Sequence, residues 1–156
     1  MKIWPPTHGA KPPKTNVIDD YRFGHTSMDP LPTVLLRHQT ISGSHYDWLM
    51  VDPRDPEGPL WTGRTGISSR GWASARRWEV EEIAPHRRLY LTYEGPISSG
   101  RGSVDRIDQG QILPQLWTGH RIVLDLSMTC CRGLVQLVRI GPKRWRAHLW
   151  PGSQIV

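Results

Sequence analysis

The apolar residues of this chain come in short runs in which every second residue is apolar, and turn-forming residues interrupt these runs. Successive side chains of a β-strand point to opposite faces, so this period of two predicts half-buried strands. The 156 residues include 14 prolines and 15 glycines, which disfavour long helices. Only SSRGWASARRW has a helical composition, and Gly71 weakens it. Nine segments fit the strand pattern: TVLLRHQ, HYDWLMVD, GPLWTG, RWEVEEI, RRLYLTYEG, GSVDRIDQG, HRIVLDLSM, LVQLVRI and RWRAHLW.

The number and length of these segments predict an all-β fold in one domain. So many short strands would not form an open single sheet with water on both faces, so we expect a small closed or half-closed antiparallel β-barrel. Six of the prolines precede residue 33, where aliphatic residues are few, which predicts that residues 1–32 form an extended, partly disordered arm. The barrel is then expected over residues 33–150, with a tail at 151–156.

The charge balance favours polyanionic partners. Lysine and arginine total 20 against 14 acidic residues, a formal net charge of +6, and 16 of these cations are arginine. The planar guanidinium suits phosphate oxygens, although a GC-rich genome also raises arginine content. No apolar run is long enough to span a membrane and no signal peptide is visible, so we expect a cytoplasmic protein without membrane contact. The only cysteines, Cys130 and Cys131, are adjacent, which excludes a disulfide scaffold and a four-thiolate zinc site.

The segment RHQTISGSHYDWLMVD holds a candidate metal site. In a strand, His45 and Asp47 share one face with Cα atoms about 6.6 Å apart, so both can reach one cation. If residues 39–44 turn the chain back, His38 lies beside His45 and completes a set of two histidines and one carboxylate, which leaves positions open for water or substrate. Mn²⁺, Zn²⁺ and Fe²⁺ are all compatible with these ligands. The alternative is that the aspartate only orients or ion-pairs a neighbouring histidine.

The segment PHRRLYLTYEG holds a candidate phosphate site. As a strand it would place apolar side chains on one face, those of Leu89, Leu91 and Tyr93, and polar side chains on the other, those of His86, Arg88, Tyr90 and Thr92. Imidazolium, guanidinium and phenol groups donate hydrogen bonds to a phosphate. The following loop, PISSGRGS, carries Arg101 and has backbone amides that can face an anion. The alternatives are a solvated strand face and an ordinary turn.

These segments, in this order, resemble the 3′-phosphoesterase domain found at the amino terminus of bacterial DNA ligase D and in small free-standing relatives. The first family motif is a histidine, a short gap and a His-Tyr-Asp strand, and the second is a histidine four residues before a tyrosine, followed by aromatic-Glu-Gly. The third is a Gly-Ser-Val strand that ends in an acidic-x-Gly turn. The matching residues are His38 with His45-Tyr46-Asp47, His86 with Tyr90 and Tyr93-Glu94-Gly95, and Gly102-Ser103-Val104 with Asp108-Gln109-Gly110. The resemblance covers about residues 33–150 and includes the closing RWRAHLW strand.

The resemblance implies a compact β-barrel with an active-site groove. It implies that His38, His45 and Asp47 hold Mn²⁺, and that His86 and Tyr90 contact the phosphate as catalytic residues. The implied activity is the trimming of a DNA or RNA–DNA primer-template 3′ end in DNA repair and end joining. A terminal ribonucleotide is removed first and the remaining 3′-phosphate second, which leaves a hydroxyl.

The chain departs from the family pattern at several points. The gap between His38 and His45 is one residue longer than usual, Ala84 stands where the family has an acidic residue, and residues 1–32 have no clear counterpart of the family's charged amino-terminal segment. The family carries an arginine two residues after the aspartate, where this chain has Leu49. We expect Arg64, Arg88 or Arg101 to supply the missing phosphate or nucleic-acid contact. Two alternatives to the enzyme remain open at this point. One is a non-catalytic module that binds nucleic-acid ends on the same barrel, and the other is a barrel that only interacts with proteins, beside a DNA ligase or polymerase.

Overall fold

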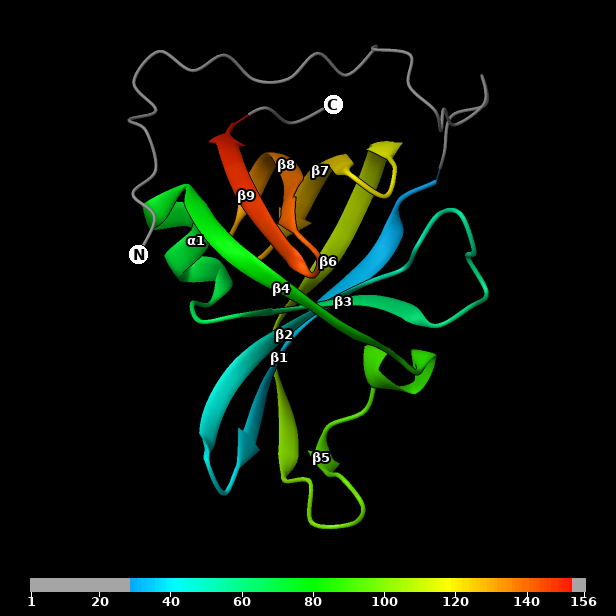
Figure 1. Cartoon of the computed structure of the whole chain (residues 1–156), viewed down its shortest axis with the longest axis vertical. Coiled ribbons are helices and arrows are strands. Elements are labelled where there is room, and N and C mark those ends of the chain that lie inside the picture. Colours follow the sequence, from blue (N-terminus) through cyan, green and yellow to red (C-terminus); the bar gives the residue numbers. More distant parts are fainter. Residues whose placement is uncertain (1–28, 153–156) are drawn as a thin grey trace.

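A computed structural model describes residues 29–152, which form one antiparallel sheet of nine strands. Its order is β1-β2-β3-β4-β9-β8-β7-β6-β5, and β1 also pairs with β6, so eight strands close a ring of hydrogen bonds (Figure 1). The strands are β1 (Leu31–Thr40), β2 (Gly43–Met50), β3 (Leu60–Thr65), β4 (Arg77–His86), β5 (Gly95–Pro96), β6 (Ser103–Trp117), β7 (Arg121–Met128), β8 (Arg132–Gly141) and β9 (Arg144–Pro151). The expected closed all-β architecture is confirmed, although the barrel is uneven because its strands differ in length.

The helical segments are short. The helix α1 (Ser69–Ala75) lies within the single segment for which a helical composition was noted. A 3₁₀-helix, η1 (Arg88–Leu91), occupies the segment for which we predicted a strand, and that prediction is wrong. The backbone N–H groups of Tyr90 and Thr92 donate locally, to the carbonyls of Arg87 and Leu89, instead of to a neighbouring strand. Neither described helix is long and apolar enough to cross a membrane.

Three clusters of buried hydrophobic residues are present in the described chain, and two of them explain how β1 and β2 pack. Six of the eight tryptophans lie in the larger core: Trp48, Trp61, Trp72, Trp78, Trp117 and Trp145. A smaller core is formed by Val34, Leu36, Leu49, Val51, Leu60 and Val104. Side chains from η1 and its surroundings pack on this smaller core, namely Tyr90, Leu91, Tyr93 and Ile97. The alternation of residues 89–93 therefore does not match the observed packing: Tyr90, Leu91 and Tyr93 contact this core, whereas Leu89 is 47% exposed.

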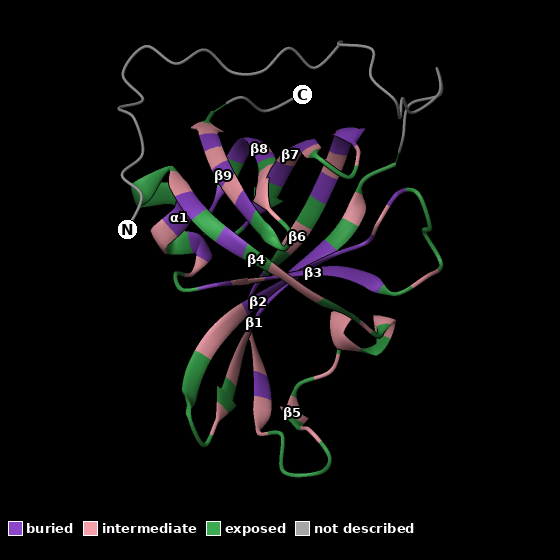
Figure 2. Ribbon diagram, viewed as in Figure 1, coloured by how far each residue is buried: buried purple, intermediate pink, exposed green. Residues whose placement is uncertain are grey.

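Because a core lies on each side of them, β1 and β2 bury both faces near the point where the strands cross. Trp48 and Leu49 are neighbours in β2, and each has 0% of its surface exposed although they enter different cores. Towards the turn between β1 and β2 the same strands become half-buried or exposed (Figure 2). This less buried end is where the candidate metal ligands lie.

The described strands extend slightly beyond the range expected for the barrel, residues 33–150. The first strand begins at Leu31, where we expected the barrel from residue 33, and the last ends at Pro151, where we expected residue 150. Most of the predicted arm, residues 1–28, and most of the predicted tail, residues 153–156, lie outside the described residues.

Asp125 in β7 should make the stability of the fold depend on pH. Burial raises the pKa of Asp125 to about 6, although a hydrogen bond from Gln115 acts to lower it, and its Oδ1 atom is buried without a partner. Since the folded pKa lies above the unfolded value of 3.8, the folded state binds the proton more tightly, and stability falls as pH rises from about 4 to about 6. We expect Asp125→Asn to raise the free energy of unfolding at pH 7 by on the order of 1–3 kcal/mol and to have little effect at pH 4.

Urea unfolding at the two pH values measures this effect. Asp105→Asn is the matched control, because the Asp105 side chain is 48% exposed. An Asp125→Asn variant that is less stable than the wild type at pH 7 would show that the carboxylate is satisfied in the folded state.

Candidate functional site

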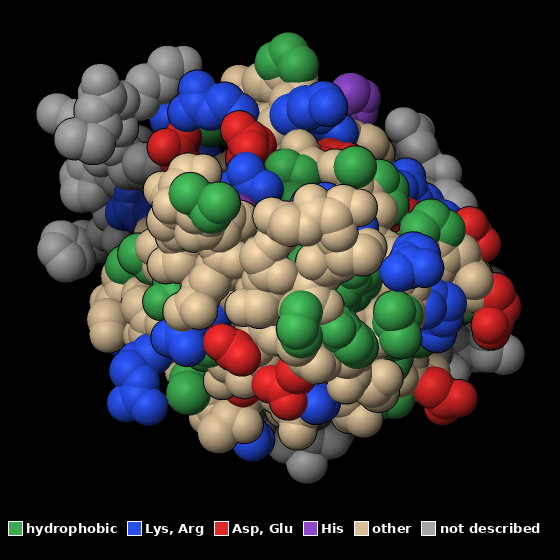
Figure 3. Space-filling view, turned by 90° about the horizontal axis from the view of Figure 1, so that it is seen from below, with side chains coloured by type: hydrophobic (Ala, Val, Ile, Leu, Met, Phe, Trp, Pro, Cys, Tyr) green, Lys and Arg blue, Asp and Glu red, His purple; other side chains and the backbone are tan. Residues whose placement is uncertain are grey.

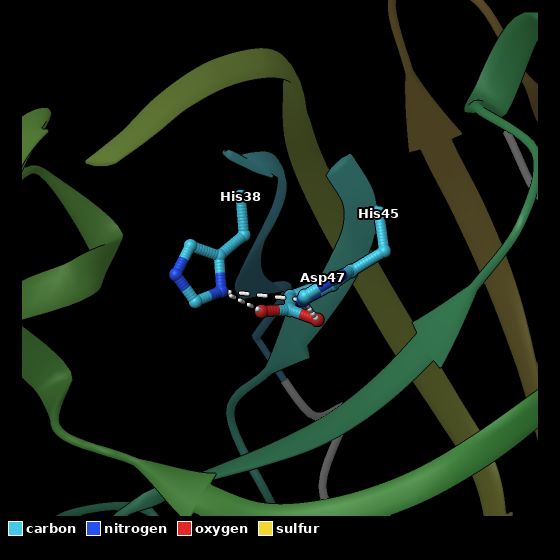
Figure 4. A group of neighbouring side chains, drawn as sticks. All are labelled: His38, His45 and Asp47. Atoms are coloured by element: carbon cyan, nitrogen blue, oxygen red, sulfur yellow. Dashed lines mark hydrogen bonds and ion pairs between the residues drawn. The ribbon is translucent and has the colours of Figure 1, made fainter. Parts of the chain in front are cut away.

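The turn between β1 and β2 places two histidines side by side. In the antiparallel register, His38 of β1 lies directly opposite His45 of β2, so the chain turns back within residues 39–44 as predicted. The Nδ1 atom of His38 and the Nε2 atom of His45 are 3.2 Å apart. Asp47 projects from the same face of β2 as His45, two residues along. Figure 4 shows the three side chains pointing toward one another from the two strands.

Asp47 is the most buried member of this cluster, with 1% of its side chain exposed. Its Oδ1 atom lies 3.4 Å from His45 Nε2 and its Oδ2 atom lies 3.7 Å from His38 Nδ1. Within the described chain Oδ1 has no hydrogen-bond partner. A buried carboxylate oxygen left unpaired costs free energy. The Oδ1 atom of Asp47 differs from that of Asp125, which is also unpaired, in lying beside histidines with which it can share a cation.

The three ligand atoms fit a divalent cation. Two ligands that are each about 2.1 Å from one ion, at an angle of about 90–110°, lie about 3.0–3.4 Å apart. The His38–His45 and His45–Asp47 separations of 3.2 and 3.4 Å fall in this range, and the His38–Asp47 separation of 3.7 Å is slightly longer. One ligand atom from each residue lies within 4.8 Å of the others. Two imidazoles and one carboxylate leave coordination positions open, as a catalytic site requires.

A loop carbonyl determines which nitrogen of His38 faces the cluster. The Nε2 atom of His38 lies 2.7 Å from the backbone oxygen of Arg101. A carbonyl only accepts hydrogen bonds, so Nε2 carries the proton and Nδ1 presents its lone pair to His45 and Asp47. Such an outer contact fixes the tautomer and orientation of a metal-binding histidine.

Burial lowers the pKa of His45, although Asp47 acts to raise it, and the neighbouring Arg64 and His38 lower it further. The neutral imidazole is therefore favoured at neutral pH, and a neutral imidazole is the form that binds metals.

Gly102 allows the loop that contacts His38 to pass close to the backbone of β1. Its φ is +88°, and a Cβ atom there would lie 1.8 Å from the backbone oxygen of Gln39. We expect Gly102→Ala to displace the loop from His38 and to weaken Mn²⁺ binding about tenfold. Gly100→Ala is the matched control, because Gly100 also has a positive φ, +66°, but has nothing within 4 Å of its Cβ position. Mn²⁺ titrations of both variants measure the difference, and equal affinities would mean that the loop contact does not organise the site.

His86 lies at the same centre, at the end of β4. Its Nδ1 atom is 3.1 Å from the backbone oxygen of Ala84 and therefore donates to it. Its Nε2 atom lies 3.6 Å from Asp47 Oδ2. The sequence predicted a phosphate contact for His86 but not this closeness to Asp47, which arises because β4 joins β2 through β3.

A cleft of about 540 Å³ opens over this centre. Six of the residues singled out in the sequence line it: His38, Asp47, Arg64, His86, Tyr90 and Arg101. Arg88 does not, because its guanidinium donates to the backbone oxygen of Pro56 at 2.6 Å, so the expectation that Arg88 faces the site is wrong. Arg87 lines the cleft in its place. A continuous strand would place Arg88 on the same face as His86. The strand ends at His86 and η1 begins at Arg88, so this relation does not hold.

The remaining arginines reach the cleft from different elements. Arg64 of β3 lies directly opposite Asp47, with its Nε atom 3.7 Å from Asp47 Oδ1 and 42% of its side chain exposed. Arg101 donates to the backbone oxygen and the Oγ atom of Ser98, at 2.9 and 3.2 Å. Leu49 is fully buried in the smaller core. The arginine side chain that lies close to Asp47 therefore comes from position 64 in β3 and not from position 49.

Comparison of the chain with known protein families and with curated proteins finds no match. His38, Asp47 and His86 line the cleft, His45 lies beside Asp47, and arginines from separate elements line the same cleft. Such an arrangement can bind a divalent cation and a phosphate together.

Proposed function

We propose that this protein is a metal-dependent phosphoesterase that acts on the 3′ end of a nucleic acid. The carrying observation is the cluster of His38, His45, Asp47 and His86 around one carboxylate, at a cleft that arginines also line. The resemblance to the 3′-phosphoesterase domain supports the same reaction, which removes a 3′-terminal ribonucleotide and then the 3′-phosphate. The proposal places the protein in DNA repair, and the resemblance alone suggests a DNA ligase or polymerase as its protein partner.

His38, His45 and Asp47 would hold the cation, for which Mn²⁺ is the first candidate and Zn²⁺ the second. A divalent ion bound there polarises a phosphoryl oxygen and stabilises the charge that develops in the reaction. The unpaired Oδ1 atom of Asp47 is the observation on this chain that fits such an ion.

His86 is the residue placed to move a proton. Its Nδ1–H is committed to Ala84, so Nε2 is the atom that can bind and release a proton in the cleft. A protonated Nε2 donates a hydrogen bond to a phosphoryl oxygen or a proton to a leaving-group oxygen. The ring of Tyr90 lies 5.6 Å from that of His86, and its phenol adds a neutral donor for the phosphate.

Arg64 would neutralise the phosphate from the β3 side. A guanidinium suits two phosphate oxygens at once, which fixes the orientation of the group as well as its charge. Arg64 also lies 3.7 Å from the buried Asp47, so a phosphate bound by Arg64 would lie close to the candidate metal ligands.

The activity test uses purified protein, Mn²⁺ and a primer-template that ends in a 3′-phosphate. We expect conversion to a 3′-hydroxyl, and we expect His45→Ala to reduce the rate at least about 100-fold, because it removes a metal ligand. His120→Ala is the control, since His120 is exposed in the turn between β6 and β7. Absence of turnover by the wild-type protein with Mn²⁺, Zn²⁺ and Fe²⁺ would reject the enzyme.

Leu49 favours a second candidate, a non-catalytic module that binds nucleic-acid ends. The resemblance places a phosphate-binding arginine at this position, and here the side chain is apolar and buried. Mn²⁺ bound without turnover, together with salt-sensitive binding of primer-template, would favour this module over the enzyme.

A further inference from the structure

The side chains that line the cleft give it a positive charge. The lining includes three arginines, Arg64, Arg87 and Arg101, and one carboxylate, that of Asp47. The three arginines come from separate places in the chain: from β3, from the junction between β4 and η1, and from the loop before β6. This arrangement provides more cationic groups than one terminal phosphate at the metal centre would need.

The three arginines differ in how they are engaged. Arg64 lies 3.7 Å from the Asp47 carboxylate, and Arg101 donates twice to Ser98. Arg87 is exposed, and its guanidinium makes no hydrogen bond or ion pair with any residue from 29 to 152. It is therefore the arginine whose donors are all available to an anion from solution.

The backbone directs Arg87 and His86 to different points of the cleft. Arg87 has extended dihedral angles, with φ of −67° and ψ of 148°. Neighbouring side chains on extended backbone point to opposite sides. His86 faces Asp47 on the floor, so Arg87 lies at a different position from the phosphate that would occupy the metal centre.

We propose that Arg87 contacts the phosphodiester next to the terminal phosphate, so that the cleft binds two consecutive phosphates of a polynucleotide. This inference rests on the proposed function, which places a nucleic-acid end in the cleft. On the face seen in Figure 3, Lys and Arg side chains are interspersed with acidic and hydrophobic ones and do not form one continuous basic surface.

Arg87→Gln and Arg88→Gln form a matched pair for the test. Each removes one positive charge, and the positions are adjacent, but Arg88 is turned to Pro56 and does not line the cleft. The probe is a fluorescein-labelled single strand with a 3′-hydroxyl, as DNA in one arm and RNA in the other, and binding is followed by fluorescence anisotropy from 50 to 200 mM salt. Thermal unfolding of both variants confirms that each is folded.

We expect Arg87→Gln to weaken binding about three- to tenfold at about 0.1 M salt, and to make the slope of log K against log salt shallower by about 0.7–0.9. Arg88→Gln should stay within about twofold of the wild type. Both arms should respond equally, because DNA and RNA share the phosphodiester. A loss confined to one arm would overturn the assignment of Arg87 to a phosphate.

A kinetic comparison separates this inference from the proposed function. With Mn²⁺, Arg87→Gln should lower kcat/KM for a 3′-phosphorylated oligonucleotide about threefold more than for a 3′-mononucleotide, which lacks the second phosphate. Equal behaviour of the two variants, with normal turnover by the wild type, would overturn the role of Arg87 alone. A wild-type protein that neither binds nor processes either nucleic acid would overturn both proposals.

Discussion

Asp47→Asn is expected to abolish metal binding while leaving the metal-free protein at least as stable as the wild type. The Asp47 side chain is 1% exposed, and its Oδ1 atom has no hydrogen-bond partner in the described structure. Arg64 and the three histidines lie 3.4–3.7 Å from the carboxylate, which is longer than an ordinary hydrogen bond. Burying the ionised group therefore remains costly for folding, so we expect its neutral isostere to relieve a penalty. The same substitution removes the anionic ligand, and we expect Mn²⁺ affinity to fall more than about 100-fold, since even outer contacts are worth about 10–100-fold.

Thermal unfolding with and without Mn²⁺ measures both effects in one experiment. At a free Mn²⁺ concentration of about 100 times its Kd, a bound ion stabilises the wild-type protein by about 2.7 kcal/mol, and Asp47→Asn should gain almost nothing. A variant that loses more than about 1 kcal/mol without metal, or that keeps the Mn²⁺-dependent shift, would show that Asp47 has a structural role.

The part of the site that the sequence could predict is the part that depends on local geometry. Alternation along one strand places His45 and Asp47 on the same face, and a tight turn brings His38 opposite His45. Both relations involve residues fewer than ten positions apart and need only the period of a strand. The candidate metal ligands were therefore accessible without a structure.

The wrong predictions depend on contacts between distant segments. Residues 88–91 alternate like a strand but form η1. Tyr90 and Leu91 pack on a core that includes residues of β1, β2, β3 and β6, whereas Leu89 is exposed. Because the strand pattern ends before η1, Arg87 lines the cleft, whereas Arg88 donates to the backbone oxygen of Pro56. Leu49 continues the polar face of β2 in sequence, yet it enters the same core. A period of two identifies a face, but it does not show what covers that face.

Asp108→Asn is expected to have the opposite effect to Asp47→Asn, although both aspartates are buried. Asp108 lies in β6 and is 4% exposed. Its two oxygens accept hydrogen bonds from Ser69 Oγ and from the backbone N–H groups of Gln109, Thr129 and Cys130, at 2.6, 2.8, 2.9 and 2.9 Å. It therefore ties the start of α1 and the turn after β7 to β6. An asparagine offers one acceptor oxygen in place of two and presents an amide to backbone donors, so we expect a loss of about 2–4 kcal/mol in the free energy of unfolding.

The pH dependence identifies the carboxylate as the cause of that loss. Burial acts to raise the pKa of Asp108, but hydrogen bonds from Ser69, Cys130, Gln109 and Thr129 bring it below its ordinary value of 3.8. Because the folded pKa is depressed, the ionised group stabilises the fold above about pH 4, and this contribution disappears as pH falls through the folded value. The difference between wild type and Asp108→Asn should therefore be largest at pH 7 and should shrink in acid.

Urea unfolding at pH 7 and at about pH 3, with a Mn²⁺ titration of the folded variant, tests both parts of the expectation. Asp108 does not line the cleft, so Mn²⁺ affinity should stay within about twofold of the wild type wherever the variant is folded. A stable Asp108→Asn protein with impaired Mn²⁺ binding would reverse the assignment of the two aspartates. Hydrogen bonding and neighbours separate these two aspartates: both oxygens of Asp108 are paired within the fold, whereas Asp47 has an unpaired oxygen in a cluster with His38 and His45.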